Sequence, residues 1–136
     1  MPKLSRGLRE KSRYGTNGSM KFKSLVPMLW TADLDKTAEF YLQTLGFECI
    51  NRMEGWALLK KDGIELMLSL PNAHETFDKI QFTGSFYFRA EGVSELWRQL
   101  KDKATVVYPL EDFEYGMREF AIRDNNGYIL QFGQEI

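Results

Sequence analysis

Polar side chains interrupt several apolar stretches of this sequence, and they are the residues best placed to do chemistry. Glu65 lies in GIELMLSL, Arg89 in GSFYFRA, Glu119 in MREFAIRD and Gln131 in YILQFG. Such groups must find hydrogen bonds or solvent, or serve a ligand, because burying them unsatisfied is costly. Glu65 and Glu119 could form a general acid and base pair, although acids near an arginine are more often ion-paired than catalytic.

The rest of the sequence offers little other catalytic chemistry. The single histidine, His74, lies in a connecting stretch, and no serine has a histidine partner in view, so nucleophilic catalysis has almost no support. Cys49 is the only cysteine, and we expect a buried thiol in a strand. The residues at 125–127, Asn-Asn-Gly, indicate a turn with no phosphate-binding motif behind it.

The elements that position these side chains recur in the same order twice. Periodicity and turn residues predict strands at 24–31, 47–51, 56–60, 63–70, 84–91, 105–109, 117–124 and 128–133, with helices at 33–46 and 93–103. Asp33 is the expected N-cap of the first helix and Gly46 its end. Two βαβββ units place the chain in the α+β class, and one helix per sheet leaves the opposite face free.

Strand alternation predicts what that free face carries. The core face would hold Leu25, Pro27, Leu29, Ile64, Leu66, Leu68, Leu70, Phe86, Phe88, Phe120, Ile122, Tyr128, Leu130 and Phe132. The free face would hold Val26, Met28, Trp30, Glu65, Met67, Ser69, Ser85, Tyr87, Arg89, Met117, Glu119, Ala121, Ile129 and Gln131. Such a mixture is too apolar for bare solvent and too polar for an ordinary core, so it predicts a ligand cavity or an interface. Three aromatic residues lie near strand starts or in the loop before 117: Trp56, Phe113 and Tyr115. They could form a lid or rim over this face, or pack in a dimer interface.

Composition and charge limit the function classes. A chain of 136 residues that is 43% hydrophobic can build one domain, which we place at 20–136, with modules at 23–70 and 83–134 joined by a linker at 71–82. Residues 1–19 hold five Lys/Arg and one Glu, and we interpret them as an appended or flexible leader rather than a transit peptide. The remainder has net charge −5, which argues against nucleic acid and suits a neutral or cationic small molecule. The lack of a long apolar run indicates no membrane span, and we expect a cytoplasmic protein.

Two stretches resemble a known family. DLDKTAEFYLQTLGFE and REFAIRDNNGYILQFG are similar to the helix and final hairpin of the vicinal oxygen chelate superfamily, which includes glyoxalase I, extradiol dioxygenases, fosfomycin-resistance enzymes and bleomycin-binding proteins. The resemblance extends over residues 24–134. It implies paired βαβββ modules that curl into an eight-stranded cup-shaped sheet, often in a homodimer with the cup at the junction.

The resemblance also assigns positions for metal ligands. In metal-dependent members four ligands, usually His, Gln or Glu, come from four cup strands, and they correspond here to Val26, to Glu65 or Met67, to Ser85 and to Gln131. An aliphatic, one carboxylate, a hydroxyl and an amide cannot make a tight site for a divalent transition metal. We therefore expect no metal and no cofactor, and we interpret Gln131 as a hydrogen-bonding group of the pocket.

Two function classes remain open. One is a metal-free binding protein similar to bleomycin-resistance proteins, which would hold a planar ligand, cationic in some cases, in a homodimeric cup. Its candidate ligand-binding residues are Met28, Trp30, Glu65, Met67, Ser85, Tyr87, Arg89, Tyr115, Met117, Glu119 and Gln131. Trp30, Tyr87 and Tyr115 would stack on the ligand, and Glu65 and Glu119 would meet its positive groups. The other class is a lyase, isomerase or transferase of the same fold with a weakly bound metal or none, for which no catalytic residue is assigned.

Overall fold

A computed structural model describes residues 20–71 and 79–136, so the leader at 1–19 and His74 lie outside the described residues. The first half contains β1 (Met28–Trp30), α2 (Leu34–Glu39), which continues as the π-helical turn η1 (Phe40–Thr44), β2 (Glu48–Met53), β3 (Trp56–Lys61) and β4 (Ile64–Ser69). The second half contains β5 (Phe86–Arg89), α3 (Val93–Leu100), β6 (Thr105–Phe113), β7 (Met117–Arg123) and β8 (Ile129–Glu135). The α+β class and the duplicated βαβββ order are confirmed. Within these ranges, no helix is long and apolar enough to span a membrane.

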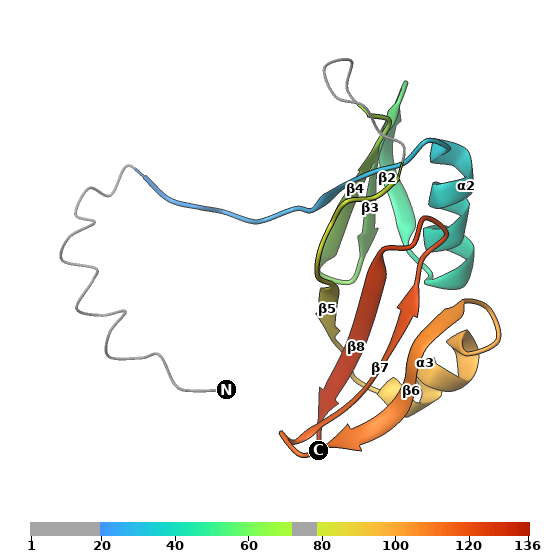
Figure 1. Ribbon diagram of the computed structural model, residues 1–136. Helices are drawn as coiled ribbons and strands as arrows, with labels where there is room; N and C mark the ends of the chain where they lie inside the picture. Colours follow the sequence, from blue (N-terminus) through green and yellow to red (C-terminus); the bar gives the residue numbers. More distant parts are fainter. Residues whose placement is uncertain (1–19, 72–78) are drawn as a thin grey trace.

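The two halves build sheets of identical topology. The first sheet has the order β1-β4-β3-β2 and the second β5-β8-β7-β6. In each sheet the first strand pairs in parallel with the last strand of its own half, and the remaining pairs are antiparallel. Figure 1 shows both helices on one side of the two sheets, which leaves the other side of each sheet without a helix.

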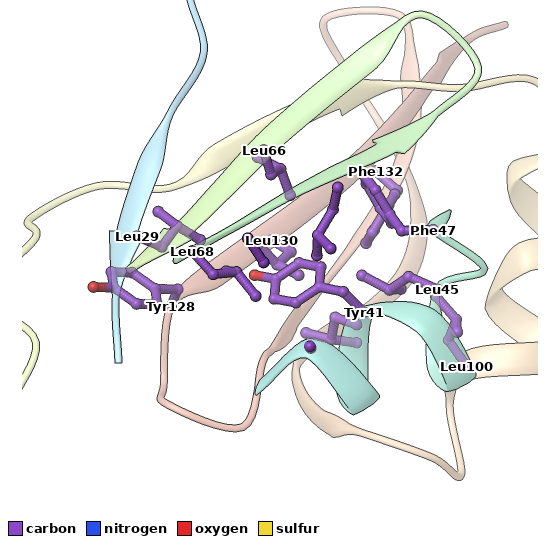
Figure 2. Packing of buried hydrophobic residues seen from close by; sticks show 14 of the residues in the cluster. Leu29, Tyr41, Leu45, Phe47, Leu66, Leu68, Leu100, Tyr128, Leu130 and Phe132 are labelled. Carbon is purple, nitrogen blue, oxygen red and sulfur yellow. The ribbon is translucent and has the colours of Figure 1, made fainter. Parts of the chain in front are cut away.

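Helix α2 begins where the sequence predicts, and its continuation η1 ends close to the predicted stop at Gly46. The carboxylate of Asp33 caps it by accepting a hydrogen bond from the backbone N–H of Lys36 at 3.0 Å. Gly46 follows its last turn with φ +78°, a conformation that glycine adopts without a steric penalty. The side chain of Tyr41 from η1 enters the core among Leu66 and Leu68 of one sheet and Leu130 and Phe132 of the other, as Figure 2 shows. The two halves therefore share one hydrophobic core.

A buried polar cluster also joins the halves. The hydroxyl of Tyr41 donates to Asp124 Oδ2 at 2.7 Å, and Asp124 Oδ1 accepts from the backbone N–H groups of Asn126 and Tyr128. Burial raises the pKa of Asp124, and the hydrogen bond from Tyr41 opposes that rise. The side-chain amide of Asn126 also reaches the hydroxyl of Thr37 in α2 at 3.0 Å. These bonds fix the turn between β7 and β8 against the first helix.

Four residues are more exposed than the sequence predicted. Leu25 is 91% exposed because it precedes β1 and has no partner strand, and Ile64 and Leu70 are each 41% exposed because they lie at the two ends of the run that forms β4. Cys49 is exposed, not buried. It belongs to the edge strand β2, where a register shift between Cys49 and Asn51 interrupts the alternation. Alternation gives the face of a side chain but not whether anything covers that face.

Candidate functional site

The predicted free-face residues fall on two separate sheets. On the first sheet, Met28 lies opposite Met67 across β1 and β4, and Trp30 lies opposite Ser69. Glu65 lies opposite Lys60 of the neighbouring strand. Met28 is 49% exposed, while Trp30, Glu65 and Met67 are half-buried. These residues make a mainly apolar face that does not reach the cavity on the second sheet.

The second sheet carries a cavity of about 870 Å³. It is lined by the candidate residues Tyr87, Arg89, Tyr115, Met117, Glu119 and Gln131, together with Gly116, Glu135 and Ile136. The volume is in the range typical of small-molecule sites. Ser85 does not line it but reaches its wall through a hydrogen bond to Gln131. The structure thus brings together most of the predicted residues of the second module, and separates them from those of the first.

Glu119 is the centre of this wall. Its side chain comes from β7, and the residue is only 3% exposed. Three phenols donate to its carboxylate: Tyr87 to Oε2 at 2.6 Å, Tyr108 to Oε1 at 3.0 Å, and Tyr115 to Oε1. The ion pairs found in the described ranges involve other residues, so Glu119 is hydrogen-bonded to phenols rather than ion-paired with Arg89.

The phenols keep this carboxylate ionised. Burial raises the pKa of Glu119, but the hydrogen bonds from Tyr115, Tyr87 and Tyr108 together lower it more, so the pKa lies below its ordinary value. The same bonds act in the opposite sense on the phenols. The hydrogen bond to Glu119, with burial second, raises the pKa of Tyr115 to about 12, and burial followed by that bond raises the pKa of Tyr87 well above its ordinary value. At neutral pH the cluster is one carboxylate surrounded by protonated phenols.

Gln131 extends the same network. Its Oε1 accepts a hydrogen bond from the Ser85 hydroxyl, and its Nε2 donates to the Tyr108 hydroxyl at 2.7 Å. The residue lies opposite Tyr87 on one side and opposite Ala121 on the other, and Ala121 is fully buried beneath the network. The mid-strand glutamine is therefore satisfied within the wall, where it fixes the oxygen of Tyr108 against Glu119.

A second cavity of about 600 Å³ lies between the two halves. Its apolar walls include Leu45 and Phe47 after α2, Phe88 of β5 and Leu96 of α3. Arg89 lines both cavities. This space has no buried charged group comparable to Glu119, so of these two cavities the one on the second sheet has the defined polar wall.

Comparison with known proteins identifies the family. A sequence model of the Glyoxalase/Bleomycin resistance protein/Dioxygenase superfamily matches residues 23–132. The chain belongs to this superfamily. It is 26% identical over 129 residues to bleomycin resistance proteins of Geobacillus stearothermophilus and Staphylococcus aureus, with 82% of this chain and 96% of each relative covered.

Solved structures agree on the fold. TioX from Micromonospora sp. ML1 is 21% identical with a TM-score of 0.69, covering 84% of this chain and 100% of that one. A glyoxalase/bleomycin resistance protein/dioxygenase from Nocardioides is 16% identical with a TM-score of 0.74, covering 94% of this chain and 93% of that one. The resemblance to the superfamily seen in the sequence is confirmed.

The positions that correspond to metal ligands in the superfamily do not fit a metal here. Val26 offers no donor atom, and the donors of Ser85 and Gln131 are engaged with each other and with Tyr108. Glu65 lies on the other sheet, opposite Lys60. In the part of the chain that the structure describes, no group of three or more His, Cys, Asp or Glu is arranged to hold an ion.

Sequence reasoning missed two members of the wall, Tyr108 and Gly133. Tyr108 lies between two register shifts in the pairing of β6 with β7, so simple alternation could not assign its face. Gly133 lies opposite Glu119, and a Cβ built there would lie 2.6 Å from Tyr87 Cζ and closer still to its hydroxyl. A glycine within a strand was the available signal, since it often marks a close approach of another group.

Proposed function

We propose that this protein binds a small, planar, cationic molecule in the cup of its second sheet, without a metal ion. The observation that carries the proposal is Glu119, which is ionised and 3% exposed, and whose partners are neutral phenols. A buried charge normally has an opposite charge nearby, because desolvating it alone is costly. A cationic ligand in the adjoining cavity supplies that charge.

The shape and lining of the cavity support a flat ligand. The ring of Tyr115 stacks on Phe113 with centroids 5.4 Å apart and planes 12° from parallel, which leaves its other face free for a further aromatic group. Met117 adds an adaptable apolar contact. Two relatives bear the name bleomycin resistance protein, which supports a small-molecule ligand.

We also propose a homodimer in which a second copy covers the first sheet and closes the cup. Met53 is 62% exposed and Met28 49%, so the face without a helix presents large apolar side chains to solvent. The extended segment before β1 runs away from the body in Figure 1, with Phe22 fully exposed. Light scattering should give twice the chain mass, and a monomer at micromolar concentration with an intact fold would contradict this arrangement.

The binding proposal is tested by titrating a panel of planar cations, neutral analogues and anions into the protein. Calorimetry should show that cations bind more tightly than neutral compounds of the same shape. Glu119→Gln should remove that preference, because the amide keeps the size of the side chain but not its charge. Glu39→Gln is the matched control, since Glu39 is an exposed residue of α2 and does not line the cavity. Equal binding of cations and neutral compounds to the wild type would overturn the proposal.

A further inference from the structure

The hydrogen-bond directions of the tyrosine cluster restrict what its ligand can be. A neutral phenol has one proton to donate. Tyr87, Tyr108 and Tyr115 each give theirs to the carboxylate of Glu119. Their oxygens can therefore only accept a further hydrogen bond. Although phenols usually donate or accept as a ligand requires, these three are restricted to accepting.

Two of the three phenols line the cavity. They are Tyr87 and Tyr115, whereas Tyr108 does not line it and already accepts from Gln131 Nε2 at 2.7 Å. Glu119 Oε1 accepts from two phenols and Oε2 from one, so Oε2 retains one acceptor position. Tyr87 and Tyr115 therefore present oxygens that the carboxylate of Glu119 polarises, and neither phenol has a free O–H to donate.

The positions of both phenols are fixed. Tyr115 is held by its stacking on Phe113, and Tyr87 lies across the backbone of Gly133, where a side chain would displace it. The other charged residues that line the cavity, Arg89 and Glu135, are exposed and of opposite sign. The charges of Arg89 and Glu135 cancel, so the net charge of the lining side chains is the single negative charge of Glu119.

We propose that this wall selects cations that carry N–H groups, such as a protonated primary or secondary amine, an amidinium or a guanidinium, over quaternary ammonium ions of similar size. The proposal rests on the function proposed above and narrows its ligand class. An N–H cation supplies both the positive charge and the donors that two acceptor oxygens need when water leaves. A quaternary ammonium supplies the charge alone, and it leaves the oxygens desolvated and unsatisfied.

The test compares three probes of one shape: naphthylmethylammonium, its N-trimethyl analogue, and naphthylmethanol. Calorimetric titration of the wild type should show the primary ammonium binding at least about tenfold more tightly than the quaternary one, as expected for a hydrogen bond to a charged group. Tyr87→Phe and Tyr115→Phe should each reduce that ratio while changing the affinity for the quaternary ion much less. Tyr87 is 42% exposed and Tyr115 64%, so neither is a core residue and the variants should fold, which melting curves verify.

Tyr128→Phe is the matched control, because its hydroxyl donates to the Trp30 carbonyl and does not line the cavity. It should leave the ratio unchanged. If both cations bind equally and more tightly than the alcohol, the inference fails while the proposed function stands. If the alcohol binds as tightly as the cations, or no probe binds, the proposed function fails and the inference with it.

Discussion

Replacing Gly133 by alanine tests whether the tyrosine cluster is built as described. A Cβ at this position would lie 2.6 Å from Tyr87 Cζ, whereas ordinary contacts of a Cβ begin near 3.4 Å. The ring must therefore withdraw by at least about 0.8 Å, and its hydroxyl by more. Since Glu119 lies directly opposite Gly133, this movement breaks the 2.6 Å hydrogen bond between Tyr87 and Glu119.

The expected size follows from two opposing terms. A hydrogen bond to a charged group contributes about 1.5–3 kcal/mol, and the lower end applies here because the phenol of Tyr87 can be resolvated. Alanine in a strand gains about 0.5–1 kcal/mol over glycine through the unfolded chain. Gly133→Ala should thus lower the free energy of unfolding by about 1 kcal/mol in the wild type. In a Tyr87→Ala background, where no ring clashes with the new Cβ, Gly133→Ala should raise the free energy of unfolding by about 0.5 kcal/mol.

Urea denaturation of the four proteins in this cycle measures the coupling between the two sites, which should be about 1.5 kcal/mol. Gly63→Ala is the control, because a Cβ there meets nothing within 4 Å. Ultraviolet titration should also show the pKa of Tyr87 returning toward its ordinary value in Gly133→Ala. If Gly133→Ala costs as much in the Tyr87→Ala background as in the wild type, the clash with Tyr87 is not the cause and the reasoning is refuted.

Four further outcomes are expected. Trp30→Ala should weaken binding of planar cations, because the proposed homodimer brings the first sheet of a second copy over the cup. It should lower the free energy of unfolding by less than the roughly 3–5 kcal/mol expected for a core tryptophan, because Trp30 is half-buried; titrations and melts measure both effects. The pKa of Tyr115 is about 12 in the fold against 10.0 ordinarily, so its contribution to stability is complete below pH 10 and is lost as the pH rises toward 12. Denaturation measured across that pH range should show that the free energy of unfolding depends less on pH in Tyr115→Phe than in the wild type. Tyr41→Phe should lower the free energy of unfolding by about 1–3 kcal/mol, since it leaves Oδ2 of the buried Asp124 carboxylate without its donor while Oδ1 keeps its two backbone donors. Elemental analysis should find no stoichiometric zinc, nickel, manganese or iron after purification without chelator.

Each of these outcomes can be contradicted. A collapsed melting temperature for Trp30→Ala would make that residue structural. An alkaline stability profile identical for wild type and Tyr115→Phe would show that its hydrogen bond to Glu119 does not form. If Tyr41→Phe changes the free energy of unfolding by less than about 0.5 kcal/mol, the hydrogen bond between Tyr41 and Asp124 does not stabilise the contact between the halves. An equimolar metal would favour the enzyme class over the binding protein.

The fold could be predicted because its signals are local and repeated. The cap at Asp33, the stop at Gly46 and the alternation of β7 and β8 each specify one element, and the order of elements recurs. The leucines of β4 that alternation placed in the core, Leu66 and Leu68, are buried. Leu25 was wrongly assigned to the core, because the alternating pattern begins before Met28, where the pairing of β1 with β4 starts.

The candidate site could be predicted only in part. Alternation placed Tyr87, Glu119 and Gln131 on one face, and they line one cavity. It could not show that three phenols converge on Glu119, because Tyr108 comes from a strand with irregular register. It also placed the first-module residues in the same cup, although the sheets are separate within one chain. Whether a second copy joins them depends on contacts that no local pattern specifies.

The most direct test is a crystal structure of the protein with naphthylmethylammonium bound. The probe should lie in the cavity of the second sheet, with its ring against Tyr115 and its nitrogen within hydrogen-bond distance, about 3 Å, of the Tyr87 or Tyr115 oxygen. Glu119 should remain bonded to its phenols. A probe in the cavity between the two halves, against Phe88 and Leu96, or one whose nitrogen points away from Glu119, would contradict the central claim.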